Sequence, residues 1–281
     1  MLSVLARRFV AGTTIEAAIA AVRALNARGM TASLDFLGED VSDRGTAEKT
    51  TRTYIGMLDA IRDSGIASNV SVKLTAIGVL VDRKLALSNL LEILERARTN
   101  PDPFVRIDME GSALTQTTLD LFEEAFSQRD NVGIVLQAYL KRTPGDVQRA
   151  LALRARVRLC KGAYKEPPAI ALASMDEIRA QYLPLAKQLL LGGTYPGIAT
   201  HDRRLLAEIE ALTAAEKIEK TAFEFQMLYG CRPTLQRELV AKGYRMRVYV
   251  PFGTHWAGYF YRRVAERREN LLFALSSIFG R

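Results

Sequence analysis

Two adjacent arginines near the end of the sequence are well suited to bind an anionic group. Arg262 and Arg263 are followed by Glu266, which comes four positions after the first and three after the second. On a helix these spacings place all three side chains on nearby faces. Paired guanidinium groups grip a carboxylate through parallel hydrogen bonds, and the glutamate would hold the two cations in place. A solvated Arg/Glu ladder would show the same pattern, so this segment alone leaves both interpretations open.

Further polar residues come at or near the ends of short apolar runs. They are Lys73, Asp108, Glu110, Gln137, Arg158, Lys161, Thr200, His201, Glu224, Gln226 and Tyr249. Lysine and arginine are almost never fully buried without a partner, so these cations need either a neighbouring side chain or a ligand. A purely structural layer would pair Lys73 with Asp108 or Glu224. For the ring of residues as a whole, we expect a ligand-binding role.

The apolar runs are strand candidates that alternate with helical patterns. The expected strands are Thr31–Phe36, Val70–Thr75, Val105–Met109, Gly133–Ala138, Val157–Lys161, Gly197–Thr200, Ala222–Met227 and Met246–Val250. The expected helices include Thr46–Asp63, Lys84–Arg98, Ala113–Ser127, Met175–Leu191, Arg203–Leu212 and Thr234–Lys242. This alternation predicts a (β/α)₈ TIM barrel. A doubly wound sheet would also hold eight strands, but no Gly-x-Gly-x-x-Gly follows the first one.

In such a barrel, functional groups collect at the C-terminal ends of the strands. We therefore expect one α/β domain over residues 1–281, a distorted barrel with a short helical N-terminal segment over about residues 1–28. A turn at Pro251-Phe252-Gly253 follows the last expected strand, so the last helix would carry Arg262 and Arg263 over the barrel mouth.

Composition narrows the classes of partner. The 39 basic and 31 acidic residues give a net charge of +8, which suits nucleic acid, an anionic membrane surface, or an anionic substrate and cofactor. The basic residues are scattered and form no nucleic-acid motif, so we expect no nucleic-acid partner. Two histidines and two cysteines without metal-binding spacing predict no metal site, although carboxylates could still bind magnesium. No signal-peptide pattern or membrane-spanning run is present, which favours a cytoplasmic protein.

Four ordered segments resemble the motifs of the proline dehydrogenase family. They are Arg158-Leu159-Cys160-Lys161-Gly162-Ala163-Tyr164, Ala199-Thr200-His201-Asp202, Phe223-Glu224-Phe225-Gln226-Met227-Leu228-Tyr229-Gly230 and Tyr259-Phe260-Tyr261-Arg262-Arg263-Val264-Ala265-Glu266. The resemblance runs from the first strand to the end of the sequence and is to the monofunctional bacterial form, with a shortened leading arm. It implies FAD-dependent oxidation of L-proline to 1-pyrroline-5-carboxylate, the first step of proline catabolism.

The resemblance also implies roles for individual residues. Lys73, Arg262 and Arg263 would bind the proline carboxylate with Glu266 steadying the cations, and Tyr164, Leu228, Tyr249 and Tyr259 would enclose the ring. The FAD site would include Met109, Gln137, Arg158, Lys161, Gly162, Ala163, Thr200 and His201. Asp108 and Arg158 would be catalytic, with Arg158 beside the redox edge of the flavin and Asp108 near both the flavin and Lys73. The amine proton could go to water or to Asp108. A membrane quinone is the expected electron acceptor.

Two other functions stay open from the residues themselves. A Schiff-base aldolase of the same fold would use Lys73 or Lys161 as the nucleophile, which requires a lysine with a low pKa. A noncatalytic basic scaffold would bind a polyanion. The apolar segment 271–279 predicts a short amphipathic helix that docks on its own barrel, so any contact with the inner membrane would be weak and peripheral.

Overall fold

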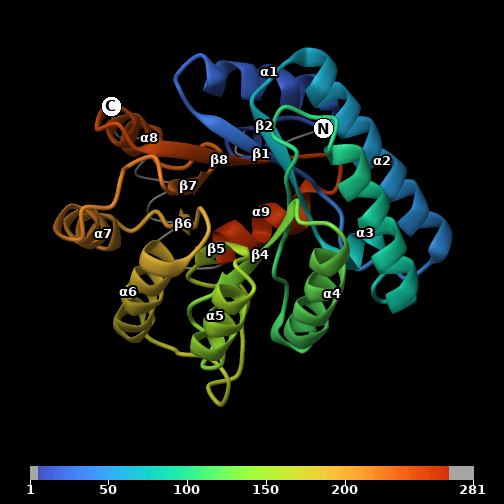
Figure 1. The fold of residues 1–281 in the computed structure, drawn as a ribbon. Coiled ribbons are helices and arrows are strands. Elements are labelled where there is room, and N and C mark those ends of the chain that lie inside the picture. The colour runs from blue at the N-terminus through green and yellow to red at the C-terminus, as the bar shows by residue number, and fades with distance from the viewer. Residues whose placement is uncertain (1–5, 266–281) are drawn as a thin grey trace.

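The strands form a closed parallel barrel. The computed structural model describes residues 6–265, without the side chains of Arg7 and residues 261–265. The strands are β1 Thr31–Phe36, β2 Ser68–Val72, β3 Val105–Ile107, β4 Val132–Gln137, β5 Arg156–Cys160, β6 Gly197–Ala199, β7 Glu224–Leu228 and β8 Arg245–Phe252. Each pairs in parallel with the next, and β8 closes the ring against β1 (Figure 1). The (β/α)₈ prediction is confirmed.

Most helices follow a strand and form the outer ring, whereas the first helix precedes β1 and the last lies across the middle of the view in Figure 1. The helices are α1 Ile15–Asn26, α2 Arg44–Ser64, α3 Arg83–Ala97, α4 Thr115–Gln128, α5 Thr143–Ala152, α6 Met175–Gly192, α7 Arg203–Ala215, α8 Pro233–Ala241 and α9 Trp256–Ala265, with short 3₁₀ turns η1 Ala6–Arg8, η2 Leu74–Ile77 and η3 Ser112–Leu114. Capping residues in the sequence determine where several of these helices begin. Asp43 accepts from the N–H of Thr46 at 2.8 Å, and Ser174 with Glu177 forms a capping box.

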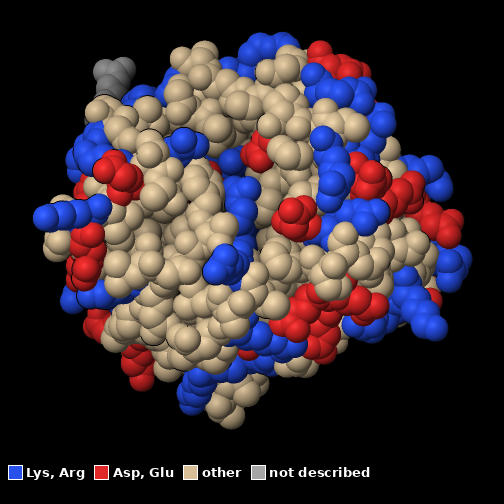
Figure 2. Space-filling model, in the orientation of Figure 1, with Lys and Arg blue, Asp and Glu red and all other residues tan. Residues whose placement is uncertain are grey.

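Charged side chains are interleaved over the outer surface. Figure 2 shows Lys and Arg alternating with Asp and Glu around the rim of one face, with further basic side chains near its middle. Many of these charges join neighbouring helices: Arg83 lies 2.6 Å from Glu124, and Lys187 lies 2.7 Å from Glu216. The excess positive charge is therefore not gathered into one uninterrupted basic surface on this face. Among residues 6–265, no helix is both long and apolar enough to span a bilayer.

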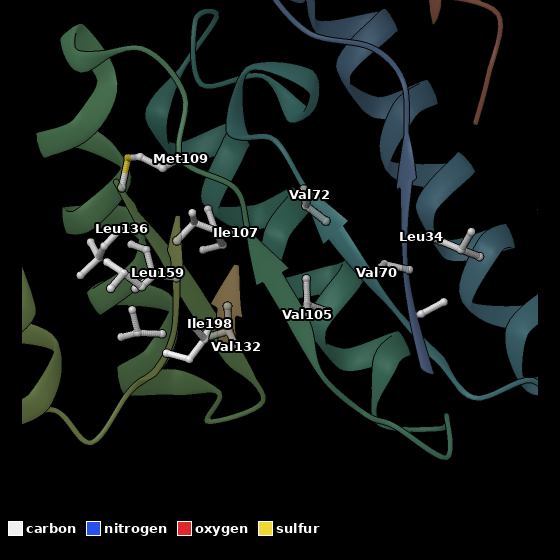
Figure 3. Close-up of a cluster of buried hydrophobic side chains, with 14 of the residues drawn as sticks. Leu34, Val70, Val72, Val105, Ile107, Met109, Val132, Leu136, Leu159 and Ile198 are labelled. Atoms are coloured by element: carbon white, nitrogen blue, oxygen red, sulfur yellow. The ribbon is translucent and has the colours of Figure 1, made fainter. Parts of the chain in front are cut away.

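The two faces of the strands differ in polarity. Alternate residues such as Leu34, Val72 and Ile107 are fully buried in a large cluster that also contains helix residues, and Figure 3 shows them projecting from β1, β2 and β3. The residues between them point the other way, because Arg158 on β5 contacts Ser71 on β2 across the barrel. The strands are apolar toward the helices and largely polar toward the barrel axis. That interior must therefore be held together by hydrogen bonds and ion pairs.

Most expected strand bounds differ from the observed ones by one to three residues, and two of these differences, together with one missed helix, have a clear local cause. β2 ends at Val72 because the chain turns into η2, where Thr75 donates its N–H and hydroxyl to Glu110 at 3.1 and 2.5 Å. β3 ends at Ile107, so Asp108 lies just beyond the strand. The helix α5 was not among the expected segments, because the Pro-Gly pair in its first turn resembles a loop.

Candidate active site

A cavity of about 1440 Å³ lies at the C-terminal ends of the strands. Parallel strands bring all their C-terminal ends to one rim of a barrel, so residues far apart in the sequence meet there. Its lining includes Lys73, Asp108, Met109, Arg158, Lys161, Thr200, His201, Gln226, Leu228 and Tyr249, together with Phe9, Tyr259 and Phe260 from the two ends of the described chain.

Lys73 is the buried cation beside this cavity. Its Nζ lies 2.8 and 2.9 Å from the two carboxylate oxygens of Asp35 and 4.0 Å from Oδ2 of Asp108. Burial alone would lower the pKa of Lys73, but these two carboxylates outweigh it and hold the pKa above its usual range. The predicted contact with Asp108 is confirmed, whereas the alternative pairing with Glu224 is wrong, because Glu224 begins its strand and lies toward the other end of the barrel.

Asp108 joins an arginine and a tyrosine next to Lys73. Its Oδ1 accepts from Nη1 of Arg158 at 2.9 Å, and its Oδ2 accepts from the hydroxyl of Tyr249 at 2.7 Å. Burial, together with the Asp108 carboxylate, raises the pKa of Tyr249 well above its usual value, so the phenol remains a proton donor. The hydroxyl points to Asp108, because a buried carboxylate is a strong acceptor.

A second contact holds Arg158 on the opposite side. Its Nε donates to Oε1 of Gln226 at 2.5 Å, and Gln226 in turn donates to Glu224 at 2.6 Å. Its guanidinium carbon lies 5.3 Å from the centre of the Tyr249 ring. Arg158 is 6% exposed. With partners on both sides it is a fixed positive charge in the cavity wall.

The loops after β5 and β6 supply the outer part of the wall. Asp202 binds two cations, Nζ of Lys161 at 3.2 Å and Nε of Arg179 at 2.8 Å, and it also caps α7 by accepting from the N–H of Arg204. Burial would raise the pKa of Asp202, but Arg179 and Lys161 bring it below its usual value. Gly162 has φ +120°, and a Cβ there would lie 2.2 Å from the ring of Tyr139. Glycine therefore allows this loop to approach closely.

His201 has a defined hydrogen-bonding role in the same wall. Its Nε2 accepts from the N–H of Leu228 at 2.9 Å, so the proton of a neutral ring is on Nδ1. This bond ties the end of β7, where Leu228 lines the cavity, to the loop after β6.

The cavity brings together most residues that the sequence singled out. Its lining contains Lys73, Asp108, Met109, Arg158, Lys161, Gly162, Ala163, Tyr164, Thr200, His201, Leu228, Tyr249 and Tyr259. Gln137 is not among the lining residues, and its amide donates to the carbonyl oxygen of Glu110 at 3.0 Å. Arg262 and Arg263 belong to α9, but their side chains are not described. Glu266 and the segment 271–279 lie outside the described residues.

Several residues of the site were missed from the sequence, among them Asp35, Phe9 and the arginines Arg179, Arg203 and Arg204. Asp35, the nearest partner of Lys73, is fully buried in β1. A signal existed, because an aspartate inside an otherwise apolar strand requires a partner. Phe9 precedes the first helix in a segment without periodicity, and no pattern in the sequence indicates that it lines the cavity.

Comparisons with known proteins agree with this geometry. A family model described as proline dehydrogenase matches residues 18–274. Proline dehydrogenase 1 of Bacillus subtilis is 42% identical over 273 residues, which cover 97% of this chain and 90% of that protein. The proline dehydrogenase of Deinococcus radiodurans is 39% identical, with 98% and 90% covered.

A solved structure shows the same architecture within a larger protein. Proline utilization A from Bdellovibrio bacteriovorus, inactivated by N-propargylglycine, superposes with a TM-score of 0.86 at 27% identity. The match covers 95% of this chain but 33% of that protein, so the chain spans about a third of its length. The family model and the two bacterial relatives extend over almost the whole sequence, and the chain belongs to the proline dehydrogenase family.

Proposed function

We propose that this protein oxidises L-proline to 1-pyrroline-5-carboxylate, with a noncovalently bound FAD as the hydride acceptor, in the first step of proline catabolism. The observation that carries the proposal is the position of Lys73, whose ammonium group lies between Asp35 and Asp108 beside a cavity of about 1440 Å³ at the catalytic end of the barrel. The names of its relatives support the same substrate.

The residues of the cavity suit a flavin dinucleotide. Its volume exceeds that of a typical site for one small molecule, which leaves room for a cofactor and a substrate together. The outer wall offers cations for a pyrophosphate, namely Lys161, Arg179, Arg203 and Arg204, and Gly162 lines the same wall without a side chain. Bound there, FAD would supply the oxidising power that protein side chains lack.

The carboxylate of proline would be held by positive charge. Lys73 lies beside the cavity with its ammonium group charged, and Arg262 and Arg263 on α9 would complete the clamp with Glu266 steadying them. Tyr164, Leu228, Tyr249 and Tyr259 would enclose the ring. Such a clamp fixes the carbon that loses hydride, so its contribution is proximity and orientation.

Arg158 and Asp108 are the proposed catalytic pair. A fixed guanidinium favours the accumulation of negative charge next to it, so Arg158 would stabilise the reduced state of the cofactor. Asp108 lines the cavity with both oxygens hydrogen-bonded, and it holds Arg158 and Tyr249 in place. It also offers a carboxylate for the proton of the substrate amine, with water as the alternative acceptor.

The observed charges weigh against the two alternative functions. An aldolase needs an uncharged lysine, but the pKa of Lys73 is raised and Lys161 is paired with Asp202. A polyanion scaffold needs a continuous basic surface, whereas basic and acidic side chains are interleaved in Figure 2.

The decisive experiment is optical. The purified protein should be yellow, L-proline should bleach it without oxygen, and mass spectrometry should find the cyclic imine in the mixture. Arg262→Met or Arg263→Met should weaken proline binding by about 2–4 kcal/mol while the flavin stays bound. A colourless protein, or a yellow one that proline leaves unchanged, would contradict the proposal.

A membrane quinone is the proposed electron acceptor, and the enzyme would work in the cytoplasm with at most weak peripheral contact to the inner membrane. A short-chain quinone should therefore restore the colour of the proline-bleached protein without oxygen. Pelleting with lipid vesicles should be weak and should disappear at high salt. Strong, salt-resistant pelleting would show that hydrophobic insertion dominates.

A further inference from the structure

The first described residues lie at the mouth of the barrel, beside the ends of β7 and β8. This segment, Ala6–Gly12, is called the N-terminal strap below. The N–H of Ala11 donates to the carbonyl of Pro251 at 2.9 Å, and the N–H of Gly253 donates to the carbonyl of Gly12 at 3.0 Å. Both bonds are formed at the end of β8, immediately before α9. The strap is therefore anchored where the chain turns from the last strand into the last helix.

The side chains of the strap pack against α9. Val10 is 1% exposed and belongs to a small cluster with Leu37 and Tyr259, against which Tyr249 and Trp256 pack. Phe9, the neighbour of Val10, packs against α9 on the side that faces the cavity. The rings of Phe9 and Phe260 are 6.5 Å apart, and both residues line the cavity with Tyr259. One side of α9 thus rests on the strap.

The loop after β7 fits the strap closely. Gly230, the last residue of one of the four family-like segments, has φ +72°, and a Cβ at this position would lie 1.8 Å from the carbonyl oxygen of Arg8. Only glycine accommodates both the left-handed backbone and this approach. The strap consequently lies against the loop after β7, the end of β8 and α9.

We propose that the N-terminal strap seats α9 and that Phe9 is a positioning residue of the substrate site. The proposal rests on the proposed function. The arginines of the carboxylate clamp lie on α9, so their distance from Lys73 depends on what supports this helix. Phe9 forms part of that support and also part of the apolar wall of the cavity. Losing it should loosen proline binding without removing a group that takes part in the chemistry.

Phe9→Ala tests this against Phe126→Ala, which removes a partly buried ring on α4 that packs on Phe122 outside the cavity lining. Phe9→Ala should raise KM for L-proline about tenfold with little change in kcat and in FAD content. Hydrogen exchange of the amides in α9 should be faster in this variant. Phe126→Ala should leave both KM and exchange in α9 at wild-type values.

A pair of glycine variants tests the fit of the strap independently. Gly230→Ala should raise KM and speed exchange in α9, as Phe9→Ala does. Gly65→Ala carries the same backbone strain, at φ +65°, but a Cβ there meets nothing within 4 Å. It should lower stability and leave KM unchanged.

If Phe9→Ala and Gly230→Ala both kept the wild-type KM for L-proline and the wild-type rate of hydrogen exchange in α9, the proposed role of the strap would be wrong. If the wild-type protein failed to oxidise proline, the proposed function would fall. The exchange measurements would then still decide whether the strap supports α9.

Discussion

The barrel interior holds two buried ionic clusters of similar composition and different access. Near the mouth, Lys73, Asp35, Asp108 and Arg158 line or adjoin the cavity. Toward the N-terminal ends of the strands, Arg247 binds Glu224 at 2.7 Å. The inner pair is closed off, whereas the outer group faces open space. The same types of charged residue can therefore bind a ligand in the cluster that reaches the cavity and stabilise the fold in the cluster that does not.

The inner cluster satisfies its own charges. Arg247 also donates to Asp102 at 3.1 Å and to the carbonyl oxygen of Ala32 at 2.7 Å. Burial would lower the pKa of Arg247, but Glu224 and Asp102 raise it above its usual range. Arg106, nearby, donates to backbone carbonyl oxygens on β4 and β5. None of these residues lines the described cavity, so a structural role accounts for them.

Loss of the outer cation should have the largest effect. Lys73→Met should lower kcat/KM for L-proline about 10³-fold, roughly 4 kcal/mol, because the substrate carboxylate loses a desolvated positive charge. The steady-state rate at several proline concentrations measures this. Since the substitution leaves Asp35 buried without its partner, the double variant Asp35→Asn/Lys73→Met serves as the control. The double variant should regain stability but not activity. If its activity also recovered, the role of Lys73 would be to stabilise the fold and not to bind the substrate.

The matching change in the inner cluster should act on stability. Glu224→Gln should lower the free energy of unfolding by about 3 kcal/mol, because Arg247 remains buried with less compensation. Urea denaturation followed by circular dichroism gives this value. kcat/KM of the folded variant should stay close to wild type, since the amide oxygen of glutamine can still accept from Gln226. A large loss of kcat/KM at unchanged stability would erase the distinction between the two clusters.

Tyr249 should have an intermediate effect, because it contacts Asp108 and also lines the cavity. Tyr249→Ser should cost about 1–3 kcal/mol in kcat/KM for proline and should narrow the preference for proline over 4-hydroxyproline. The ratio of kcat/KM for the two substrates is the measurement. Tyr249→Phe keeps the ring and removes the hydroxyl, so it should preserve the preference. If both variants kept the wild-type ratio, the bulk of the ring would have no part in specificity.

The smallest predicted effect is the pH dependence of the stability that the inner cluster contributes to the fold. Burial would raise the pKa of Glu224, but Arg247 and the hydrogen bonds to this carboxylate bring it below its usual value of 4.5. Its stabilising contribution is therefore complete above that pH and is lost as the pH falls through the depressed pKa. The stability gap between wild type and Glu224→Gln should be constant near neutrality and narrow by about 1 kcal/mol or less near pH 3.5. If the stability difference between wild type and Glu224→Gln grew at acid pH, the pKa of Glu224 would be raised and not lowered.

The sequence predicts what depends on local pattern. The strands follow from β-branched runs, and the residues after them fall at one rim because parallel strands share a direction. Lys73, Arg158 and Tyr249 all meet in the cavity as this rule requires. The polar interior was also indicated by the sequence, because charged residues within or directly after apolar strands require partners.

The position of each polar residue along the barrel axis could not be predicted in the same way. Glu224 and Lys73 were considered as partners, yet one begins β7 and the other follows the end of β2. Strand assignment gives the order of the residues, but which pairs share a layer depends on the stagger between strands. Contacts between distant segments, such as Phe9 with Phe260, have no periodic signal at all.

The N-terminal strap also has a consequence for biosynthesis. The strap is synthesised well before its partners at the end of β8 and in α9, because more than two hundred residues separate them. β1 likewise waits for β8 before the barrel can close. Contacts of such long sequence separation form late, so helices and strands can assemble during translation while the mouth stays incomplete. The substrate site would thus be complete only after β8 and α9 have been made, and a product truncated before them would lack it.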